Sequence, residues 1–469
     1  MNDFRDKVGT VDNLGRRIWI YAKKPFGKFY NYRQIVGYAL IIVLFVIPFI
    51  KVNGNPLLLF NILEGKFIIF SLIFTAQDMH LFAIMMLIIM IFIVLFTVVF
   101  GRLFCGWVCP QTVFMELVFR RIEYAIEGDY NQQKKLNAGE WTTEKIGKKA
   151  IKHVIFFLIA FCIGNLFLSY IIGKDQVFQI MKDPISQHIY GFIAMVIFSS
   201  LFYGVFAFFR EQVCVAVCPY GRLQSVMLDS NSLVVIYDWV RGEPRGKKLR
   251  KEVEPSIESI VLPKGDCVDC NLCVKVCPTG IDIRNGTQME CVNCTACMDA
   301  CDDVMQKVNR DTGLIRLDSY NNIKHGKSKL LTTRVLSYCA VLLALIVLQS
   351  FLLLNRSDVE LIVQRTPGML FQKNEDGTIS NLYNYQIINK TAEEIDHLVL
   401  TVDSDVATIK TIGQNADITT IRAANGSFFI MIPEDQLKGA NNNIKIKLMK
   451  GEKVLDEINT NFLGPIKSN

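Results

Sequence analysis

Charged residues are scarce in this sequence. Asp, Glu, Lys and Arg make up 20% of its 469 residues, whereas hydrophobic residues make up 51%. A composition this apolar excludes an ordinary soluble protein of this length and predicts membrane spans. Cysteine is absent from about the last 115 residues, and no catalytic constellation stands out in that region.

The formal net charge is +7, and the basic residues are unevenly distributed. Residues 1–33 contain eight Lys and Arg, residues 101–152 contain nine, and residues 51–79 contain two. A basic excess can indicate nucleic-acid binding, but here the basic residues flank apolar runs. This distribution follows the positive-inside rule, so we expect a membrane protein with no nucleic-acid partner.

Five apolar runs are long enough to cross a bilayer. They are Ile35 to Ile50, Leu81 to Phe100, Val154 to Ile172, His188 to Phe209 and Val335 to Leu354. The basic amino terminus lacks the small-residue cleavage site of a secretory signal, so the first run is expected to be retained. The charge pattern then predicts a cytoplasmic amino-terminal arm (1–34), helices one to four (35–209), a cytoplasmic segment (210–334), helix five (335–354) and a periplasmic domain (355–469).

An apolar but interrupted stretch follows the first run, from Pro56 to Ala76. Glu64, Gly65 and Lys66 stand at its middle. Charges at a bilayer centre are costly. We therefore expect this stretch to be an interfacial or re-entrant segment on the outer face rather than a sixth span.

Eight cysteines lie between residues 267 and 301 in two runs of the form C-x2-C-x2-C-x3-C. The first run is Cys267, Cys270, Cys273 and Cys277, and the second is Cys291, Cys294, Cys297 and Cys301. This is the bacterial two-cluster ferredoxin pattern, in which the fourth cysteine of each run binds the other cluster. A zinc ribbon would leave the third cysteine of each run unexplained, and disulfides do not persist in the cytoplasm.

The pattern predicts a ferredoxin domain over about residues 258–310 with two 4Fe-4S clusters. The first ligand group would be Cys267, Cys270, Cys273 and Cys301, and the second ligand group Cys277, Cys291, Cys294 and Cys297. Clusters of this kind carry one electron at a time. The chain is therefore expected to transfer electrons.

Two further cysteine pairs stand at the ends of the second and fourth apolar runs, at 105–110 and 214–219. Both have the form C-x3-C-P, and we name Cys105, Cys109, Cys214 and Cys218 the membrane-edge cysteines. If the helix continues to each proline, positions four apart share one face and the two pairs can converge. They could then hold a third iron–sulfur cluster, bind copper as Cu(I), or act as a redox dithiol.

Residues 355–469 contain short β-branched and aromatic runs separated by turn-rich sequences. The expected strands include Tyr385 to Ile388, His397 to Val402 and Ile444 to Leu448, and the expected turns include Glu375 to Gly377 and Ala424 to Gly426. Regularly spaced short strands over this length predict a β-sandwich.

With these motifs, the chain resembles the cytochrome c oxidase accessory proteins of the FixG/CcoG family, which are membrane-bound polyferredoxins. The resemblance rests on the sequences Gly101 to Thr112, Cys218 to Gln224, Cys277 to Arg284 and Cys301 to Met305, in this order and followed by a β domain. It implies five spans in the bacterial inner membrane, a two-cluster ferredoxin domain and a carboxy-terminal immunoglobulin-like module.

The resemblance also implies a function. Family members are associated with the reduction of Cu(II) to Cu(I) for assembly of a cbb(3)-type oxidase, so a cupric reductase activity is expected. Copper, oxidase assembly factors and an unidentified electron donor would then be the partners, with a homodimer left open. Two alternatives remain at this point: an electron-transfer subunit between a quinol and a partner enzyme, and a scaffold whose clusters only stabilise the fold.

Overall fold

A computed structural model describes most of the chain. The described residues are 14, 16–52, 55–62, 66–70, 72–74, 78–246, 265–368, 370–390, 395–404, 406–412, 418–420, 423–437 and 439–465. Much of the expected amino-terminal arm and the first residues of the expected ferredoxin domain, 258–264, lie outside them. Two compact units are present: Met1–Ile47 with Ile84–Ile346, and Pro48–Ala83 with Val347–Asn469.

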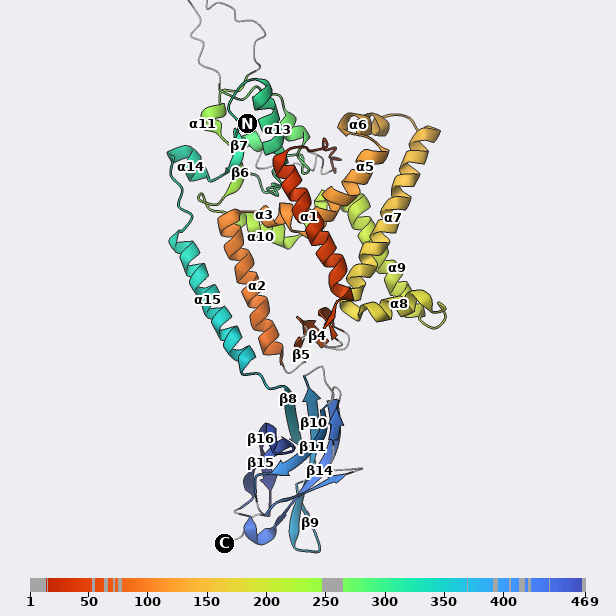
Figure 1. Cartoon of the computed structure of the whole chain (residues 1–469), viewed down its shortest axis with the longest axis vertical. Helices are drawn as coiled ribbons and strands as arrows, with labels where there is room; N and C mark the ends of the chain where they lie inside the picture. Colours follow the sequence, from red (N-terminus) through yellow and green to blue (C-terminus); the bar gives the residue numbers. More distant parts are fainter. Residues whose placement is uncertain are drawn as a thin grey trace, which may run out of the picture. The chain divides into compact units, whose positions relative to one another are not determined.

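Five helices among the described residues are long and apolar enough to cross a membrane, which confirms the predicted number. They are Lys28–Phe49, Met79–Phe100, Thr143–Ile172, Ile189–Phe209 and Thr333–Leu354. The first of these consists of α1 (Lys28–Val46) and a short 3-10 turn, and the second and third are α2 and α7. The fourth consists of α9 (Ile189–Gly204) and a π-helical end, and the fifth is α15. In the first unit α7 and α9 run side by side, joined by α8 (Lys174–Lys182) (Figure 1).

Helix α7 begins eleven residues before the predicted apolar run. Thr142 caps it, because its hydroxyl oxygen accepts a hydrogen bond from the Lys145 amide at 3.3 Å, and Glu144 suits the positive end of the helix dipole. The first turns of α7 therefore carry Lys145, Lys148, Lys149 and Lys152 ahead of the apolar part. The helix is a span with a basic extension.

Short helices connect the spans of the first unit. They are α3 (Leu103–Trp107), α4 (Pro110–Phe114), the π-helix η4 (Met115–Phe119), α5 (Arg120–Ile126), α6 (Tyr130–Ala138), the π-helix η5 (Val205–Phe209), the π-helix η6 (Val213–Val217) and α10 (Pro219–Met227). Phe119 is fully buried and stacks on Phe206, with 4.4 Å between ring centroids, and on the edge of Phe156. These aromatic contacts fix the connecting helices to α7 and to the π-helical end of the span that contains α9.

The ferredoxin region packs into the first unit. Its elements are the antiparallel pair β6 (Val234–Tyr237) and β7 (Ile315–Asp318), with α11 (Trp239–Gly242), α12 (Leu272–Lys275), the 3-10 helix η7 (Ile283–Asn285), α13 (Ala296–Lys307) and α14 (Tyr320–His325). The Asp299 carboxylate of α13 accepts hydrogen bonds from the Phe29 and Tyr30 amides at 3.1 and 2.8 Å. These amides open α1, so a ferredoxin residue caps the first membrane helix.

The described residues between 51 and 74 form short strands in the second unit. These are β1 (Lys51–Val52), β2 (Asn55–Pro56), β3 (Leu58–Asn61), β4 (Lys66–Ile69) and β5 (Leu72–Phe74), and β3, β4 and β5 make one antiparallel sheet. The edge strands of an open three-stranded sheet would leave backbone N–H and C=O groups without hydrogen bonds in lipid. This agrees with the expectation that this stretch does not span the membrane. Its place at the interface stays a prediction.

Buried charges tie this stretch to the carboxy-terminal domain. The Asp78 carboxylate pairs with Arg356 and with Lys390, each at 2.8 Å, and Lys390 also pairs with Glu360 at 2.9 Å. The Arg356 guanidinium lies 5.1 Å from the centre of the Phe74 ring. The end of the strand-rich stretch is therefore ion-paired to residues just before β8 and just after β10 of the β domain.

The carboxy-terminal domain is a two-sheet antiparallel sandwich, as predicted. One sheet contains β8 (Val359–Arg365), β9 (Gln372–Lys373), β10 (Thr378–Asn389), β12 (Thr408–Ile412) and β14 (Ala423–Pro433). The other contains β11 (Ile395–Val402), β13 (Ile418–Thr420), β15 (Asn441–Lys450) and β16 (Lys453–Leu463). The expected turn at Ala424 to Gly426 is wrong, because these residues pair with β10 inside β14.

Candidate metal centres

The two cysteine runs of the ferredoxin region share one backbone conformation. Asp269 and Asn271 flank Cys270 with φ of 53° and 56°, and Asn293 and Thr295 flank Cys294 with φ of 52° and 62°. Left-handed residues at these positions turn the chain so that backbone N–H groups form concave anion-binding nests, which are common at iron–sulfur sites. The backbone therefore suits a negatively charged cluster at each run.

A small cavity lies among these cysteines. Its lining includes all four members of the second ligand group, Cys277, Cys291, Cys294 and Cys297, together with Cys273. Apolar side chains such as Ile281, Ile283 and Val292 complete it. A buried, sulfur-lined space with apolar walls fits a 4Fe-4S cluster, whose ligands are thiolates.

Cys301 and Cys291 each have a cysteine of the other run among their neighbours. The pKa of Cys301 is raised to about 12, first by burial and then by Cys273, Asp302, Cys270 and Cys267. The pKa of Cys291 is likewise raised to about 12, first by burial and then by Cys277 and Cys294. Cys301 thus lies with the first run and Cys277 with the second, although the ligand sets themselves stay a prediction.

The described residues do not include three or more His, Cys, Asp or Glu side chains arranged to hold one single metal ion. A zinc ion keeps its thiolates about 2.3 Å away and therefore close to one another. A 4Fe-4S cluster spreads four ligands around a body of several atoms. Raised thiol pKa values also mean that iron binding must release protons here.

The structure corrects the expected helical path through the membrane-edge cysteines. Cys105 lies in α3, but Cys109 has an extended backbone, with φ −58° and ψ 123°, and α4 begins at Pro110. Cys214 lies in η6, and Cys218 is extended, with φ −72° and ψ 110°, before α10 begins at Pro219. A residue that precedes proline avoids the helical region, so each helix breaks at its second cysteine.

The membrane-edge cysteines nevertheless converge. The pKa of Cys105 is raised to about 11 by burial and also by Cys109 and Cys218, while Arg102 lowers it. The pKa of Cys214 is raised to about 12, first by burial and then by Cys109 and Cys105. Four soft sulfur donors from two distant segments therefore share one small region.

Gln224 fixes the position of one of these thiols. The Cys105 Sγ donates a hydrogen bond to Gln224 Oε1 at 2.9 Å, and Gln224 Nε2 donates to Thr97 Oγ1 at 2.9 Å. Gln224 is 1% exposed. The resemblance covered this glutamine within Cys218 to Gln224, but its role becomes visible only when α10 packs against α2.

The membrane-edge cysteines adjoin the ferredoxin cysteines. A second cavity is lined by Cys214, by Thr112 and by ferredoxin residues Thr279 and Val292, and the latter two also line the cavity of the second ligand group. At Gly106, between Cys105 and Cys109, an added Cβ would lie 2.3 Å from Val292 O. Only a glycine permits this close approach of the two backbones.

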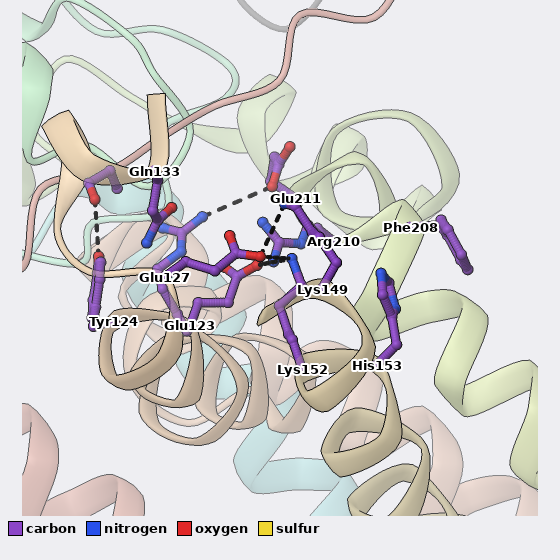
Figure 2. A network of polar contacts seen from close by, with 12 residues as sticks. Glu123, Tyr124, Glu127, Gln133, Lys149, Lys152, His153, Phe208, Arg210 and Glu211 are labelled. Carbon is purple, nitrogen blue, oxygen red and sulfur yellow. Dashed lines mark hydrogen bonds and ion pairs between the residues drawn. The ribbon is translucent and has the colours of Figure 1, made fainter. Parts of the chain in front are cut away.

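A buried network of charges borders the same cavity, and the sequence analysis missed it. Glu123 pairs with Arg210 and, at 3.3 Å, with Lys152, while Glu127 pairs with Lys152 at 2.7 Å and with Lys149 at 2.9 Å. Figure 2 shows the basic side chains pointing toward the two carboxylates. Burial alone would raise the pKa of Glu123, but Arg210 and Lys152 hold it below its usual value.

The network extends toward Cys214 through Glu211, which accepts from Arg17 at 2.9 Å and lies 3.9 Å from Arg120. Arg120 also pairs with Glu116 at 2.9 Å. The available signal was the spacing of Glu116, Arg120, Glu123 and Glu127, three or four residues apart on one helix face. Pairing with α7 and residue 210 could not be read from that spacing.

Family models match three parts of the chain. A 4Fe-4S dicluster domain matches residues 209–320, a 4Fe-4S binding domain matches residues 82–126, and the IG-like fold at the C-terminus of FixG matches residues 350–465. The first two ranges contain all eight ferredoxin cysteines and all four membrane-edge cysteines.

Three curated proteins are similar over most of their length. The nitrogen fixation protein FixG of Rhizobium meliloti (strain 1021) is 31% identical over 85% of this chain and 82% of its own. Protein RdxA and protein RdxB of Cereibacter sphaeroides are each 30% identical, over 86% and 88% of this chain and 87% and 88% of their own. With its 4Fe-4S domains and apolar helices, the chain is a multi-pass membrane iron–sulfur protein that transfers electrons.

Proposed function

This chain belongs to the FixG family, and from that premise we propose that it reduces Cu(II) to Cu(I) at the membrane-edge cysteines. Each Cu(II) takes up one electron, which a one-electron donor supplies through the ferredoxin region. The family resemblance suggests that the Cu(I) formed serves the assembly of a cbb(3)-type oxidase. The observation that supports this proposal is the convergence of four thiols, one buried and three half-buried, beside the cavity of the second ligand group.

The proposed ligands suit the two redox roles. The eight ferredoxin cysteines would hold two 4Fe-4S clusters, and a bound cluster accepts and passes one electron at a time. The membrane-edge cysteines offer soft thiolates, which select Cu(I) over Cu(II). Because thiolates bind Cu(I) more tightly than Cu(II), the reduction of copper is more favourable at the membrane-edge cysteines.

We place the ferredoxin region on the cytoplasmic side of a bacterial inner membrane and the β domain on the periplasmic side. The basic residues at 1–33 and 101–152 support this orientation. Alkaline phosphatase fused after Asn355 should be active, and the same reporter fused after residue 330 should be inactive. The opposite pattern would invert the proposed orientation.

The test of copper reduction uses full-length protein, purified without oxygen, reduced with dithionite and then desalted. Cu(II) is added with a chelator that reports Cu(I). The wild type is expected to form Cu(I) well above a protein-free control, and Cys105→Ser with Cys214→Ser should abolish most of it. A wild type no faster than the control would refute the proposal.

Two isolated cysteines provide the matched control. Cys162 and Cys339 are exposed on α7 and α15, away from the four-thiol region. Their joint replacement by serine should leave the rate of Cu(I) formation unchanged, which would exclude reduction by any accessible thiol.

Cluster oxidation by a quinone analogue, in protein that binds no copper, would instead favour the role of an electron-transfer subunit between a quinol and a partner enzyme.

A further inference from the structure

Two arginines near the second ligand group are buried and lack acidic partners among the described residues. Arg33 is 2% exposed, and its Nε donates to the Gly106 carbonyl at 2.7 Å. Arg102 is 3% exposed and donates to the Met289 carbonyl. Arg33 Nη2 and Arg102 Nε have no hydrogen-bond partner within the described chain.

Both guanidinium groups lie close to cysteines of this group. Gly106, which binds Arg33, packs so closely that an added Cβ would be 3.1 Å from Cys294 Cα. Arg33 is therefore bound to a glycine that packs against the backbone of Cys294. Arg102 is bound to the Met289 carbonyl, two residues before Cys291 in the chain.

Acidic groups also surround the second ligand group, but they are compensated. Glu116 lines the second cavity with Thr279 and Val292, but its carboxylate is paired with Arg120 at 2.9 Å. Glu290 precedes Cys291, is half-buried and lines one cavity with Arg102. With one carboxylate against two buried arginines, the balance of nearby charge at the second ligand group is positive. Because both arginines are buried, solvent screens them little.

The first ligand group has the opposite surroundings. Arg284 faces Cys273, but it is ion-paired with Asp269 at 2.6 Å and with Asp282 at 2.7 Å. Asp302 directly follows Cys301, and within the described residues its carboxylate accepts a hydrogen bond from the Gly313 amide at 2.8 Å and forms no ion pair. The nearby charge here is negative on balance.

Reduction adds an electron to a cluster, so a nearby positive charge favours the reduced state and a negative charge disfavours it. We propose that Arg33 and Arg102 stabilise the reduced state of the cluster held by the second ligand group and thereby direct electrons toward the membrane-edge cysteines. Electrons would enter at the first ligand group, whose Cys270 is exposed. Arg102 also faces Cys105, so its charge lies between the donor and acceptor sites.

The test is a redox titration of full-length protein followed by electron paramagnetic resonance, in the absence of copper. Cys270→Ser, which alters an exposed ligand of the first group, assigns the two signals. In the wild type the second cluster is expected to have the higher potential. At a fixed potential, Arg33→Gln should lower the ratio of reduced to oxidised second cluster on the order of tenfold. The reduction potential of the first cluster should stay unchanged.

Three variants separate charge from packing. Arg33→Lys keeps the charge and should retain most of the wild-type ratio, and Arg102→Gln should repeat the effect of Arg33→Gln without altering α1. Arg284→Gln should change the first cluster and spare the second. Equal shifts of both clusters in Arg33→Gln and Arg102→Gln, unchanged potentials in both, or a second cluster of lower potential in the wild type would overturn the inference.

The inference rests on the proposed cluster ligands but not on copper. If the potentials follow the expected order and Cu(II) is still not reduced, only the proposed copper chemistry fails. If Cu(II) is reduced while the potentials ignore Arg33 and Arg102, only the inference fails.

Discussion

The β domain and the ferredoxin region have different kinds of core. The β domain has a continuous apolar core in which Tyr383 and Phe428 are fully buried and stack at 5.7 Å, and it contains no cysteine. The core of the ferredoxin region contains cysteine thiols, Cys267 and Cys273 among them, beside a smaller set of apolar residues. The first can fold by apolar burial alone, whereas the second depends on the group that its thiols bind.

The largest expected effect is the loss of iron. Anaerobic treatment of the full-length protein with a chelator should unfold residues 265–310 and leave residues 355–465 folded, because metal binding contributes on the order of 10 kcal/mol to small metal-dependent folds. Limited proteolysis with mass-spectrometric mapping measures this. Equal protection of both regions after iron loss would remove the contrast between them.

Phe428→Ala tests the apolar core. Removing a fully buried phenylalanine should lower the free energy of unfolding of the β domain by about 3–5 kcal/mol, as measured by thermal unfolding, with unchanged iron content. Phe371→Ala is the matched control, since Phe371 is exposed. A loss of iron in Phe428→Ala would show that the two regions are not independent.

Glu123→Gln tests the buried charges of the first unit. Arg210 and Lys152 would lose a carboxylate partner, so stability should fall by about 3 kcal/mol at neutral pH. The pKa of Glu123 is lowered in the fold. Its contribution is therefore complete above the unfolded pKa and is lost as pH falls through the folded value.

Unfolding measured from neutral pH into acid should accordingly show the difference between wild type and Glu123→Gln shrink. Glu144→Gln is the control, because the Glu144 carboxylate is exposed and pairs with Lys148 at the surface. A difference that grows in acid would contradict the sign of the shift.

Gly106→Ala is expected to have the most local effect, on electron transfer. The new methyl group would push Val292 and Cys294 away from the membrane-edge cysteines, so Cu(I) formation should fall about tenfold with both clusters retained. Gly147→Ala in α7 has no neighbour within 4 Å of the added Cβ and should behave as wild type. An unchanged rate in Gly106→Ala would separate this contact from electron transfer.

Local pattern predicted much of this architecture. The apolar runs gave the five helices, the alternating runs near Tyr385 and Ile444 fell within strands, and the cysteine spacing indicated the 4Fe-4S domains. Each of these signals is contained in a short window of sequence. The prolines that follow Cys109 and Cys218 interrupt the helix, and this too is a local effect. The prediction of a continuous helix was wrong because it did not consider these prolines.

The sequence by itself determined how many helices are long and apolar enough to span a membrane, that 4Fe-4S domains are present and that a β-sandwich follows the last helix, because spacing and apolar periodicity act between near neighbours in the chain. Only the tertiary structure decided that Arg33 lies beside Gly106 and Cys294, that Glu123 pairs with Arg210, and that Val292 borders both cavities. The energy of a charge depends on its burial and on partners from distant segments, and neither is present until those segments pack together.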